Sequence, residues 1–483
     1  MGGLLCKLHI VEVGSVKKSG RNNSSFKMLG VLLGPLLFAI IPFLKISELS
    51  HDAHVVLGLM AWMMAWWLSE LLPLGVTALL PILVLPSSNI LKLSEVTPIY
   101  GSDIIFLFLG GFLISIALEK WKLHQALAER ILPFFSRSVS FLLLGFMLIT
   151  AALSMWISNT ACAFMMLPMA LAVAKKFSKH SVDIEKALLF GVAYSASIGG
   201  VGTIIGSPPN AILIGYLENN DLWAPSFGRW FIMAAPLLIF GLLACWLVIR
   251  FFYLRKGISI GDLQKSIEFS RWSKNQKRVL IVFILTAMAW ILRPLIPGNA
   301  ITDTWIAVAA IVVLYLIPSA EKTGEALLAL HDLSKVSWSI LLLFGGGLTL
   351  AKAFQITGFD QWMAYQLTGL LDLGVWVLIL IIVLVSIMFT EIGSNTAVAA
   401  LIVPIVGSLS GALGQAQGIA LIFAVTFGAS LSFMMPMATP PNAIVFHSKR
   451  IHLTEMIKIG FWLNLIFWVL ISLVAYFWIP IVI

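Results

Sequence analysis

Apolar runs of helix length, separated by short polar loops, cover most of this 483-residue sequence. A helix that crosses the hydrocarbon core of a bilayer needs about 20 predominantly apolar residues, and many of the runs approach or reach that length. They lack the sustained apolar–polar alternation of a transmembrane β-strand. The pattern therefore predicts an all-α polytopic membrane protein. The predicted helices lie near residues 29–46, 54–71, 74–88, 103–118, 187–216, 230–253, 279–296, 302–318, 336–352, 417–446 and 455–481.

Two further apolar runs, 138–174 and 373–407, are each interrupted by the same polar motif, Ser-Asn-Thr, at residues 158–160 and 394–396. If each interruption is a turn, the arms on either side are too short to cross the membrane. Irregular backbone at membrane depth is tolerated only where it is buried in protein or lines a cavity. We therefore predict two re-entrant hairpins with the Ser-Asn-Thr motifs at their tips.

A second motif, Pro-Pro-Asn, follows each hairpin, at residues 208–210 and 440–442. Glycine pairs precede each hairpin, at residues 110–111 and 345–346. Motifs that recur in the same order predict two halves with the same architecture. Helix-breaking residues at corresponding positions of two halves are the best sequence indication of a transporter binding site.

Basic residues are distributed unevenly among the predicted loops. The chain is 60% hydrophobic and 11% charged, whereas soluble domains are about 25% charged. With the N-terminus inside, about eleven crossings and two hairpins that do not cross, 26 of the 31 Lys and Arg residues fall on the inside. This distribution follows the positive-inside rule. The net charge of +9 therefore reflects topology and does not indicate a nucleic-acid partner.

This topology makes the second half inverted relative to the first, because one hairpin enters from inside and the other from outside. We expect a cytoplasmic tail (1–28), a first inverted repeat (29–253), a basic cytoplasmic linker (254–278) and a second inverted repeat (279–483).

The two tips and the two Pro-Pro-Asn motifs together predict one ion-binding site. Helices are expected to restart after each motif, so that four helix N-termini point at one region and favour an anion. Asn159 and Asn395 each offer an amide donor to the anion and a carbonyl oxygen to a cation. Broken helices supply free carbonyl groups for Na⁺, and a co-bound Na⁺ offsets the cost of an anion at membrane depth. The hydroxyl donors suited to carboxylate oxygens are Ser158, Thr160, Ser207, Ser394, Thr396 and Thr439.

These motifs, with the Trp-Trp-Leu-Ser-Glu segment at 66–70, resemble the divalent anion/sodium symporter family, in particular bacterial sodium-coupled dicarboxylate transporters. The resemblance extends over the chain from about residue 30. It implies a homodimer in a bacterial inner membrane, an elevator-like cycle and Na⁺ as the coupling ion. In citrate-preferring animal members the second motif ends in Val. Because both motifs here end in Thr, the resemblance favours C4 dicarboxylates such as succinate, fumarate and malate.

The resemblance also implies roles for individual residues. The positions that match substrate contacts are Ser158, Asn159, Thr160, Ser207, Ser394, Asn395, Thr396, Thr439 and Pro440. The positions that match a first sodium site are Ser154, Asn159 and Gly206, and those that match a second are Thr390, Asn395 and Ala438.

Other functions stay open at this point. The same fold could carry a sodium-independent dicarboxylate or citrate/succinate exchanger, or a sulfate or tricarboxylate symporter. A channel would need a continuous pore, whereas tips that meet from opposite sides predict an occluded site. An enzyme is not expected, because the metalloprotease, nucleophile-elbow and Walker motifs are absent from the sequence. Glu391, beside the second tip, either carries a proton or, as we predict, is a hydrogen-bonded structural carboxylate.

Overall fold

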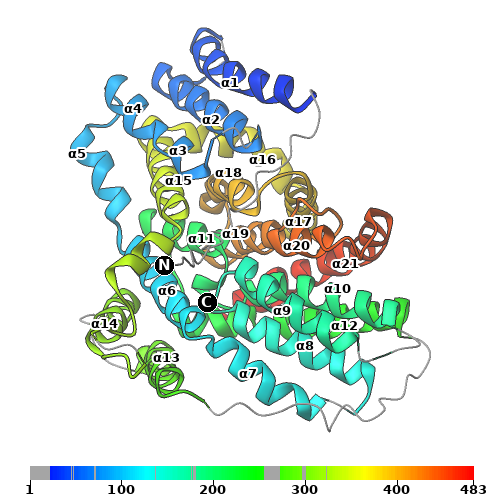
Figure 1. Ribbon diagram of the computed structural model, residues 1–483. Coiled ribbons are helices and arrows are strands. Elements are labelled where there is room, and N and C mark those ends of the chain that lie inside the picture. Colours follow the sequence, from blue (N-terminus) through cyan, green and yellow to red (C-terminus); the bar gives the residue numbers. More distant parts are fainter. Residues whose placement is uncertain are drawn as a thin grey trace, which may run out of the picture.

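All regular elements that the structure describes are helices, apart from an isolated bridge between Pro318 and Ala326 (Figure 1). This confirms the predicted all-α class. Of the predicted segments, the tail up to residue 21 and the linker from 255 to 271 lie outside the described residues. The computed structural model describes residues 22–44, 46, 48–69, 72–135, 137–175, 177, 181–254, 272–295, 301–321 and 324–483.

The first helices of the chain form one flank of the molecule (Figure 1). Helix α1 (Asn22–Ile40) packs along α2 (His51–Ser69). The predicted helix 74–88 is instead divided into α3 (Leu74–Thr77) and α4 (Leu80–Ser87). The division falls just before Pro81, whose missing N–H is tolerated only in the first turn of a helix. A short helix, α5 (Leu93–Val96), follows.

The same order of elements then occurs twice. Each set has a long helix, a short helix, two helices joined at Ser-Asn-Thr, two helices joined before Pro-Pro-Asn, and a long final helix. The first set is α6 (Asp103–Lys120), α7 (Leu123–Ile131), α8 (Val139–Ser154), α9 (Asn159–Ala174), α10 (Ser181–Gly200), α11 (Pro208–Asn219) and α12 (Phe227–Tyr253). The second is α15 (Trp338–Thr357), α16 (Phe359–Leu371), α17 (Val375–Ile392), α18 (Asn395–Ser408), α19 (Gln415–Ser430), α20 (Pro440–His447) and α21 (Leu453–Leu473).

Three further helices complete the described chain. Between the two sets, α13 (Lys274–Leu292) packs against α14 (Asp303–Leu316), which lies along α6. After α21 a π-helical turn leads into α22 (Ile479–Val482). The repeated order fits a duplicated architecture, while the inversion of one half relative to the other stays a prediction.

Among the residues that the structure describes, six helical stretches are long and apolar enough to cross a membrane by length and composition. They are Leu93–Lys120, Phe227–Tyr253, Lys274–Leu295, Trp338–Thr357, Val375–Ile392 and Leu453–Val482. Helices α8, α9 and α18 are shorter, as predicted for hairpin arms. The 18 residues of α17 are not, so arm length alone does not distinguish a hairpin from a crossing there. The number of crossings therefore stays a prediction.

Two helices are broken at the Pro-Pro-Asn motifs. Helix α10 ends at Gly200 and α11 begins at Pro208, while α19 ends at Ser430 and α20 begins at Pro440. Proline suits the first helical position, because the N–H it lacks would have no intrahelical partner there. The motif thus sets where each second helix starts.

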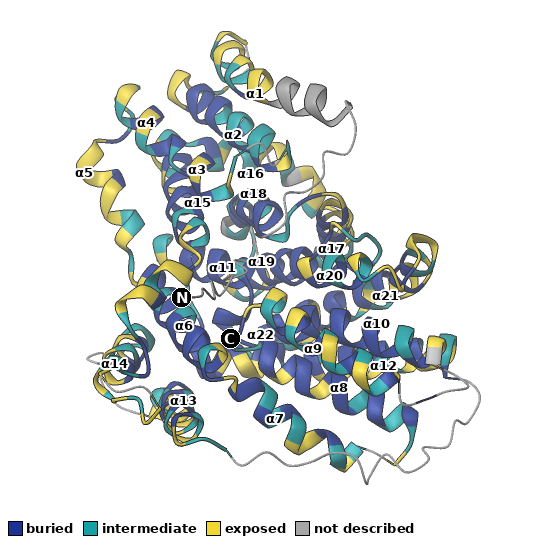
Figure 2. Cartoon of the chain, in the orientation of Figure 1, coloured by how far each residue is buried: buried dark blue, intermediate teal, exposed yellow. Residues whose placement is uncertain are grey.

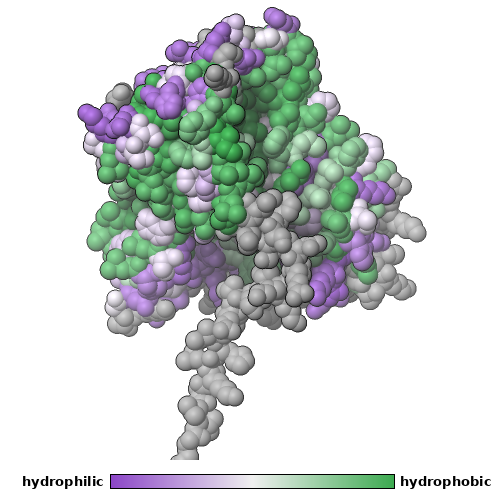
Figure 3. All heavy atoms as spheres, turned by 90° about the horizontal axis from the view of Figure 1, so that it is seen from above, coloured by the Kyte–Doolittle hydropathy of each residue, from purple (hydrophilic) through white to green (hydrophobic). Residues whose placement is uncertain are grey.

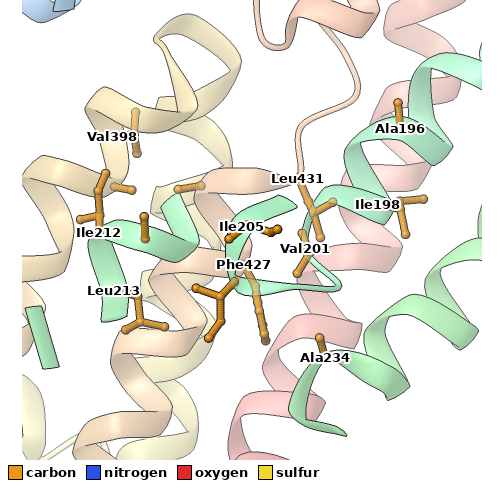
Figure 4. Packing of buried hydrophobic residues seen from close by; sticks show 14 of the residues in the cluster. Ala196, Ile198, Val201, Ile205, Ile212, Leu213, Ala234, Val398, Phe427 and Leu431 are labelled. Carbon is orange, nitrogen blue, oxygen red and sulfur yellow. The ribbon is translucent and has the colours of Figure 1, made fainter. Parts of the chain in front are cut away.

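Apolar side chains pack around both breaks. Val201 and Ile205 of the first break lie near Leu431 of the second (Figure 4). Trp230 of α12 connects the two, because its Nε1 donates to the Val201 carbonyl at 3.0 Å and its ring lies 5.1 Å from that of Phe423 on α19. The unwound segments therefore rest on a shared apolar core.

The outer surface is strongly apolar. Buried residues concentrate in α10, α11 and α19, whereas α13 and α14 are widely exposed (Figure 2). Leu285 on α13 is 61% exposed and Leu316 on α14 is 74% exposed. Seen from above, hydrophobic residues cover broad areas and hydrophilic ones gather towards the edges (Figure 3). Such areas would promote aggregation in water but suit contact with lipid.

Candidate functional site

A cluster of oxygen atoms lies behind the tip of the first hairpin, α8–α9. The hydroxyl of Ser154 lies 2.6 Å from Asn159 Oδ1 and 2.7 Å from the carbonyl oxygen of Ala196 on α10. Ser154 is fully buried. Its single hydroxyl proton satisfies only one of these two acceptors at a time. Lone pairs of three oxygens therefore converge at this point.

The second hairpin, α17–α18, repeats this arrangement. The hydroxyl of Thr390, also fully buried, lies 2.5 Å from Asn395 Oδ1 and 2.9 Å from the carbonyl oxygen of Ala429 on α19. Asn395 Nδ2 additionally donates to the Ser430 carbonyl at 3.3 Å. In both hairpins the hydroxyl residue ends or nearly ends the first arm, and the asparagine starts the second arm five positions later.

Asn210 of the first Pro-Pro-Asn motif closes the first helix break. Its Nδ2 donates to the carbonyl oxygens of Gly200, at 3.0 Å, and Thr203, at 2.7 Å. The Thr203 hydroxyl in turn donates to the Met155 carbonyl at the hairpin tip. A Cβ atom on Gly206 would lie 2.6 Å from the Gly200 carbonyl oxygen, so the close backbone approach requires glycine at position 206.

Asn442 of the second Pro-Pro-Asn motif closes the second break in the same way. Its Nδ2 donates to the carbonyl oxygens of Ser432, at 3.4 Å, and Met435, at 3.2 Å. These acceptors precede Asn442 by ten and seven positions, the same separations as in the first break. The two halves thus use one local design.

Glu391 holds the second break against the second hairpin. Its Oε1 accepts from the N–H groups of Phe433 (2.8 Å) and Met434 (2.9 Å) and from Asn464 Nδ2 (2.6 Å). Its Oε2 accepts from the N–H of Met435 at 2.8 Å. Four donors satisfy a carboxylate that is only 5% exposed, which favours a structural role over proton transfer.

A cavity of about 630 Å³ lies between the hairpin tips and the restarted helices. All nine residues predicted to contact the substrate line it: Ser158, Asn159, Thr160, Ser207, Ser394, Asn395, Thr396, Thr439 and Pro440. Gly206 and Ala438, predicted for the two sodium sites, line it as well. Ser154 and Thr390 do not line it but contact the asparagines that do. The structure thus brings all predicted site residues together, while their roles in binding stay predictions.

Four helices begin at the wall of this cavity. Their N-cap residues are Ser158 (α9), Ser207 (α11), Ser394 (α18) and Thr439 (α20). The Ser158 and Thr439 hydroxyls accept hydrogen bonds from N–H groups of their own helices, whereas Ser207 and Ser394 make no such cap. Helices α11 and α20 begin with two prolines, so the free N–H groups come from α9 and α18. These N–H groups and the positive ends of four helix dipoles meet at one space, which favours an anion.

Charged residues that the sequence analysis did not identify line the same cavity, namely Glu119 on α6 and Lys335 before α15. Lys335 and Lys120 each place Nζ 2.8 Å from one oxygen of the fully buried Asp332. Burial alone would raise the pKa of Asp332, but hydrogen bonds from both lysines and from the Ala329 N–H lower this pKa to about 2. The ionised carboxylate thereby positions Lys335 at the cavity.

The oxygen clusters at the tips have the donors that suit Na⁺. Each combines a hydroxyl, an amide oxygen and a backbone carbonyl from a helix that then breaks. Within the described part of the chain, no group of three or more His, Cys, Asp or Glu side chains is placed to hold a metal ion.

Comparison with known proteins identifies the family. A model described as citrate transporter matches residues 59–428, which contain both hairpins and the first helix break. The chain belongs to this citrate transporter family. It is accordingly a multi-pass membrane transporter and not an enzyme.

Individual members of the citrate transporter family align over nearly the whole chain. The sodium-dependent dicarboxylate transporter SdcS of Staphylococcus saprophyticus is 37% identical over 96% of this chain and 94% of its own length. SdcS of Staphylococcus aureus strain USA300 is 35% identical over 97% of this chain and 94% of its own length. The crystal structure of the YdaH transporter from Alcanivorax borkumensis superposes with a TM-score of 0.60, covering 95% of this chain and 100% of that one. At 13% identity it supports the transporter fold alone.

The role of two residues, Asn210 and Asn442, could not be predicted from the sequence of this family member. Both are fully buried, and both hold a helix break through paired hydrogen bonds. The signal was their recurrence at the same place in both Pro-Pro-Asn motifs. A buried amide that occurs at both helix breaks is typical of a residue that donates hydrogen bonds to the backbone carbonyl groups left unpaired there.

Proposed function

We propose that this protein imports C4 dicarboxylates such as succinate, fumarate and malate, coupled to Na⁺. The observation that carries the proposal is the duplicated tip, in which an anion-attracting set of helix N-termini adjoins two clusters of oxygen atoms. The names of the Staphylococcus relatives, sodium-dependent dicarboxylate transporters, support the same pair of ions.

The asparagines at the tips couple the two ions. Oδ1 of Asn159 and of Asn395 belongs to an oxygen cluster that would hold Na⁺. The Nδ2 atom of each amide carries two protons, and a proton that is not bound within the protein serves the substrate carboxylates. The dianion binds poorly alone, because its charge is costly inside the membrane. Bound Na⁺ lowers that cost, so each ion raises the affinity of the other by the same factor.

The position of the cavity supports an alternating-access mechanism. It reaches Lys335 and Ser337, at the end of the molecule that the charge distribution assigns to the cytoplasm. We place the N-terminus on that side and the protein in the plasma membrane of a bacterium as a homodimer. Transport then requires the two hairpins to carry the site to the opposite face in an elevator-like movement.

Citrate is a second candidate substrate, since the matching family model is described as citrate transporter. A cavity of about 630 Å³ lies within the usual range for small-molecule sites, about 300–1,000 Å³, and does not by itself exclude a tricarboxylate. The paired Ser-Asn-Thr motifs favour the smaller dicarboxylates, and competition between the two anions decides the question.

Uptake of labelled succinate into proteoliposomes tests the proposal. An inward Na⁺ gradient is expected to drive accumulation, and replacement of Na⁺ by K⁺ or choline to abolish it. Unlabelled fumarate and malate should compete more strongly than citrate or sulfate. Uptake that persists in choline, or that needs preloaded internal dicarboxylate, would favour an exchanger.

A further inference from the structure

A groove of about 1,150 Å³ runs between the ends of two long helices, α12 and α21, away from the substrate cavity. The two helices pack against each other and lie together on the right side of the molecule in Figure 1. Apolar side chains form most of the lining: Leu247, Val248, Phe251, Phe252, Leu254, Trp462 and Ile466. Leu247 and Trp462 are each 48% exposed, so the groove opens to the surroundings of the protein.

Two basic side chains, Arg250 and Lys458, also line this groove. The Arg250 guanidinium lies 5.3 Å from the ring centre of Trp246 on its own helix. The Lys458 ammonium reaches from α21 to α12, where it lies 5.3 Å from the ring centre of Phe252. Both cations thus lie beside aromatic rings, which attract the charge without neutralising it.

Two carboxylates on α21 and α10 are engaged by other basic residues. Glu455, one turn before Lys458, is bound by Lys186 at 2.6 Å. Glu185 lies 3.2 Å from Arg450. Among the residues that the structure describes, neither Arg250 nor Lys458 forms an ion pair with an acid. Within the described part of the chain, the basic end of the groove therefore carries two positive charges without an acidic partner, beside an apolar slot.

We propose that this groove binds one anionic glycerophospholipid. Its phosphate bridges Arg250 and Lys458, and its acyl chains lie along the apolar slot. Both residues fall in segments that the charge distribution assigns to the cytoplasmic side, where anionic lipid and basic pockets between membrane helices meet. A zwitterionic lipid fits the slot equally well, but its own cation would oppose the two basic groups.

The groove is also connected to both hairpins of the substrate site. The Trp246 ring lies beside the Arg250 guanidinium. Its Nε1 donates to the Ser140 carbonyl at the start of α8, at 2.8 Å. Trp468, beyond Ile466 on α21, donates to the Leu380 carbonyl on α17 at 2.7 Å. Helices α12 and α21 are therefore each hydrogen-bonded to one hairpin, and a bound lipid would lie against both helices.

Native mass spectrometry of the purified full-length protein, mixed with equal amounts of phosphatidylglycerol and phosphatidylcholine, tests this proposal. The unaltered protein is expected to retain phosphatidylglycerol about tenfold more than phosphatidylcholine, since each basic group near a membrane surface strengthens binding of anionic lipid severalfold. The double variant Arg250→Gln/Lys458→Gln should lose this preference, and Arg250→Lys/Lys458→Arg should keep it. Both side chains are exposed, so folding should be unaffected.

A matched control is Arg137→Gln/Lys175→Gln, which removes two other exposed basic residues from segments assigned to the same side. It should keep the preference. Equal retention of the two lipids by the unaltered protein, or equal loss in the control and the test variant, would overturn the proposal. Displacement of the lipid by millimolar sn-glycerol 3-phosphate would also overturn it, because the groove would then bind the headgroup without the chains.

Discussion

The two hairpin tips share their ion-facing chemistry but differ in how they are supported. Each places a buried hydroxyl, an asparagine oxygen and a backbone carbonyl together, with Ser154 in one tip and Thr390 in the other. The residue after the hydroxyl differs. At the first tip Met155 offers its backbone carbonyl to Thr203, whereas at the second Glu391 binds three N–H groups and Asn464 with its side chain.

This difference distinguishes the atoms proposed to bind ions from the residues that hold the tips in place. The atoms proposed to hold ions recur in both halves, while the attachment of the broken helix is achieved once by a neutral hydrogen bond and once by a buried carboxylate. Charge-assisted bonds are roughly twice as strong as neutral ones. The second tip should therefore depend on its supporting residue more than the first does.

The largest effect is expected where the tips are alike. Asn159→Ala and Asn395→Ala should each reduce sodium-dependent succinate uptake to roughly 1% or less, since residues that merely support a ligand already cost 10- to 100-fold. Each substitution removes an atom proposed to serve both ions. Near-normal uptake by either variant, at wild-type levels of folded protein, would contradict the proposal that both asparagines bind both ions.

The next effect should appear where the tips differ. Glu391→Gln removes a buried charge that four donors satisfy and places an amide N–H₂ against backbone N–H groups, at a cost of about 3 kcal/mol. The matched substitution at the first tip, Met155→Leu, should cost less than about 1.5 kcal/mol, because the backbone carbonyl makes the contact. Thermal unfolding in detergent measures both, and equal costs would contradict the proposed asymmetry.

The sequence predicted the breaks and tips better than their supports. Apolar runs, prolines and repeated motifs are local signals, so most helices, both Pro-Pro-Asn restarts and the motif residues that line the cavity could be located, whereas Glu119 and Lys335 could not. The partners of Glu391 lie 42 to 73 positions away, and the Lys120–Asp332 contact spans 212 positions. Such pairings depend on tertiary packing, which apolar periodicity does not encode. The division of 74–88 into two helices was missed because its overall hydrophobicity hides the effect of Pro81.

A smaller effect should follow from loosening the first tip. Thr203→Val removes the hydroxyl that binds the Met155 carbonyl and leaves that buried acceptor without its partner, at a cost of about 1–2 kcal/mol. We expect a lower melting temperature and a raised Na⁺ concentration for half-maximal uptake. Thr203→Ser, which keeps the hydroxyl, serves as the control. A Val variant as stable as the Ser variant would show that this contact does not support the tip.

The smallest effect should fall on selectivity. Thr396→Val removes one hydroxyl from the cavity but leaves the oxygen cluster of Thr390 and Asn395 in place. The preference for succinate over citrate should shift by up to about tenfold, the lower end of the worth of one hydrogen bond to a charged group, with little change in sodium dependence. Competition uptake at several Na⁺ concentrations separates the two. An unchanged preference would remove Thr396 from the anion site.

The mutual dependence of the two ions is tested most directly by succinate binding to the purified protein, measured by calorimetry at fixed ionic strength. Replacing choline with saturating Na⁺ should lower the Kd of succinate at least tenfold, which corresponds to a coupling free energy of about 1.4 kcal/mol. Succinate should lower the apparent Kd of Na⁺ in return. The same succinate affinity in Na⁺ and in choline would contradict the shared site.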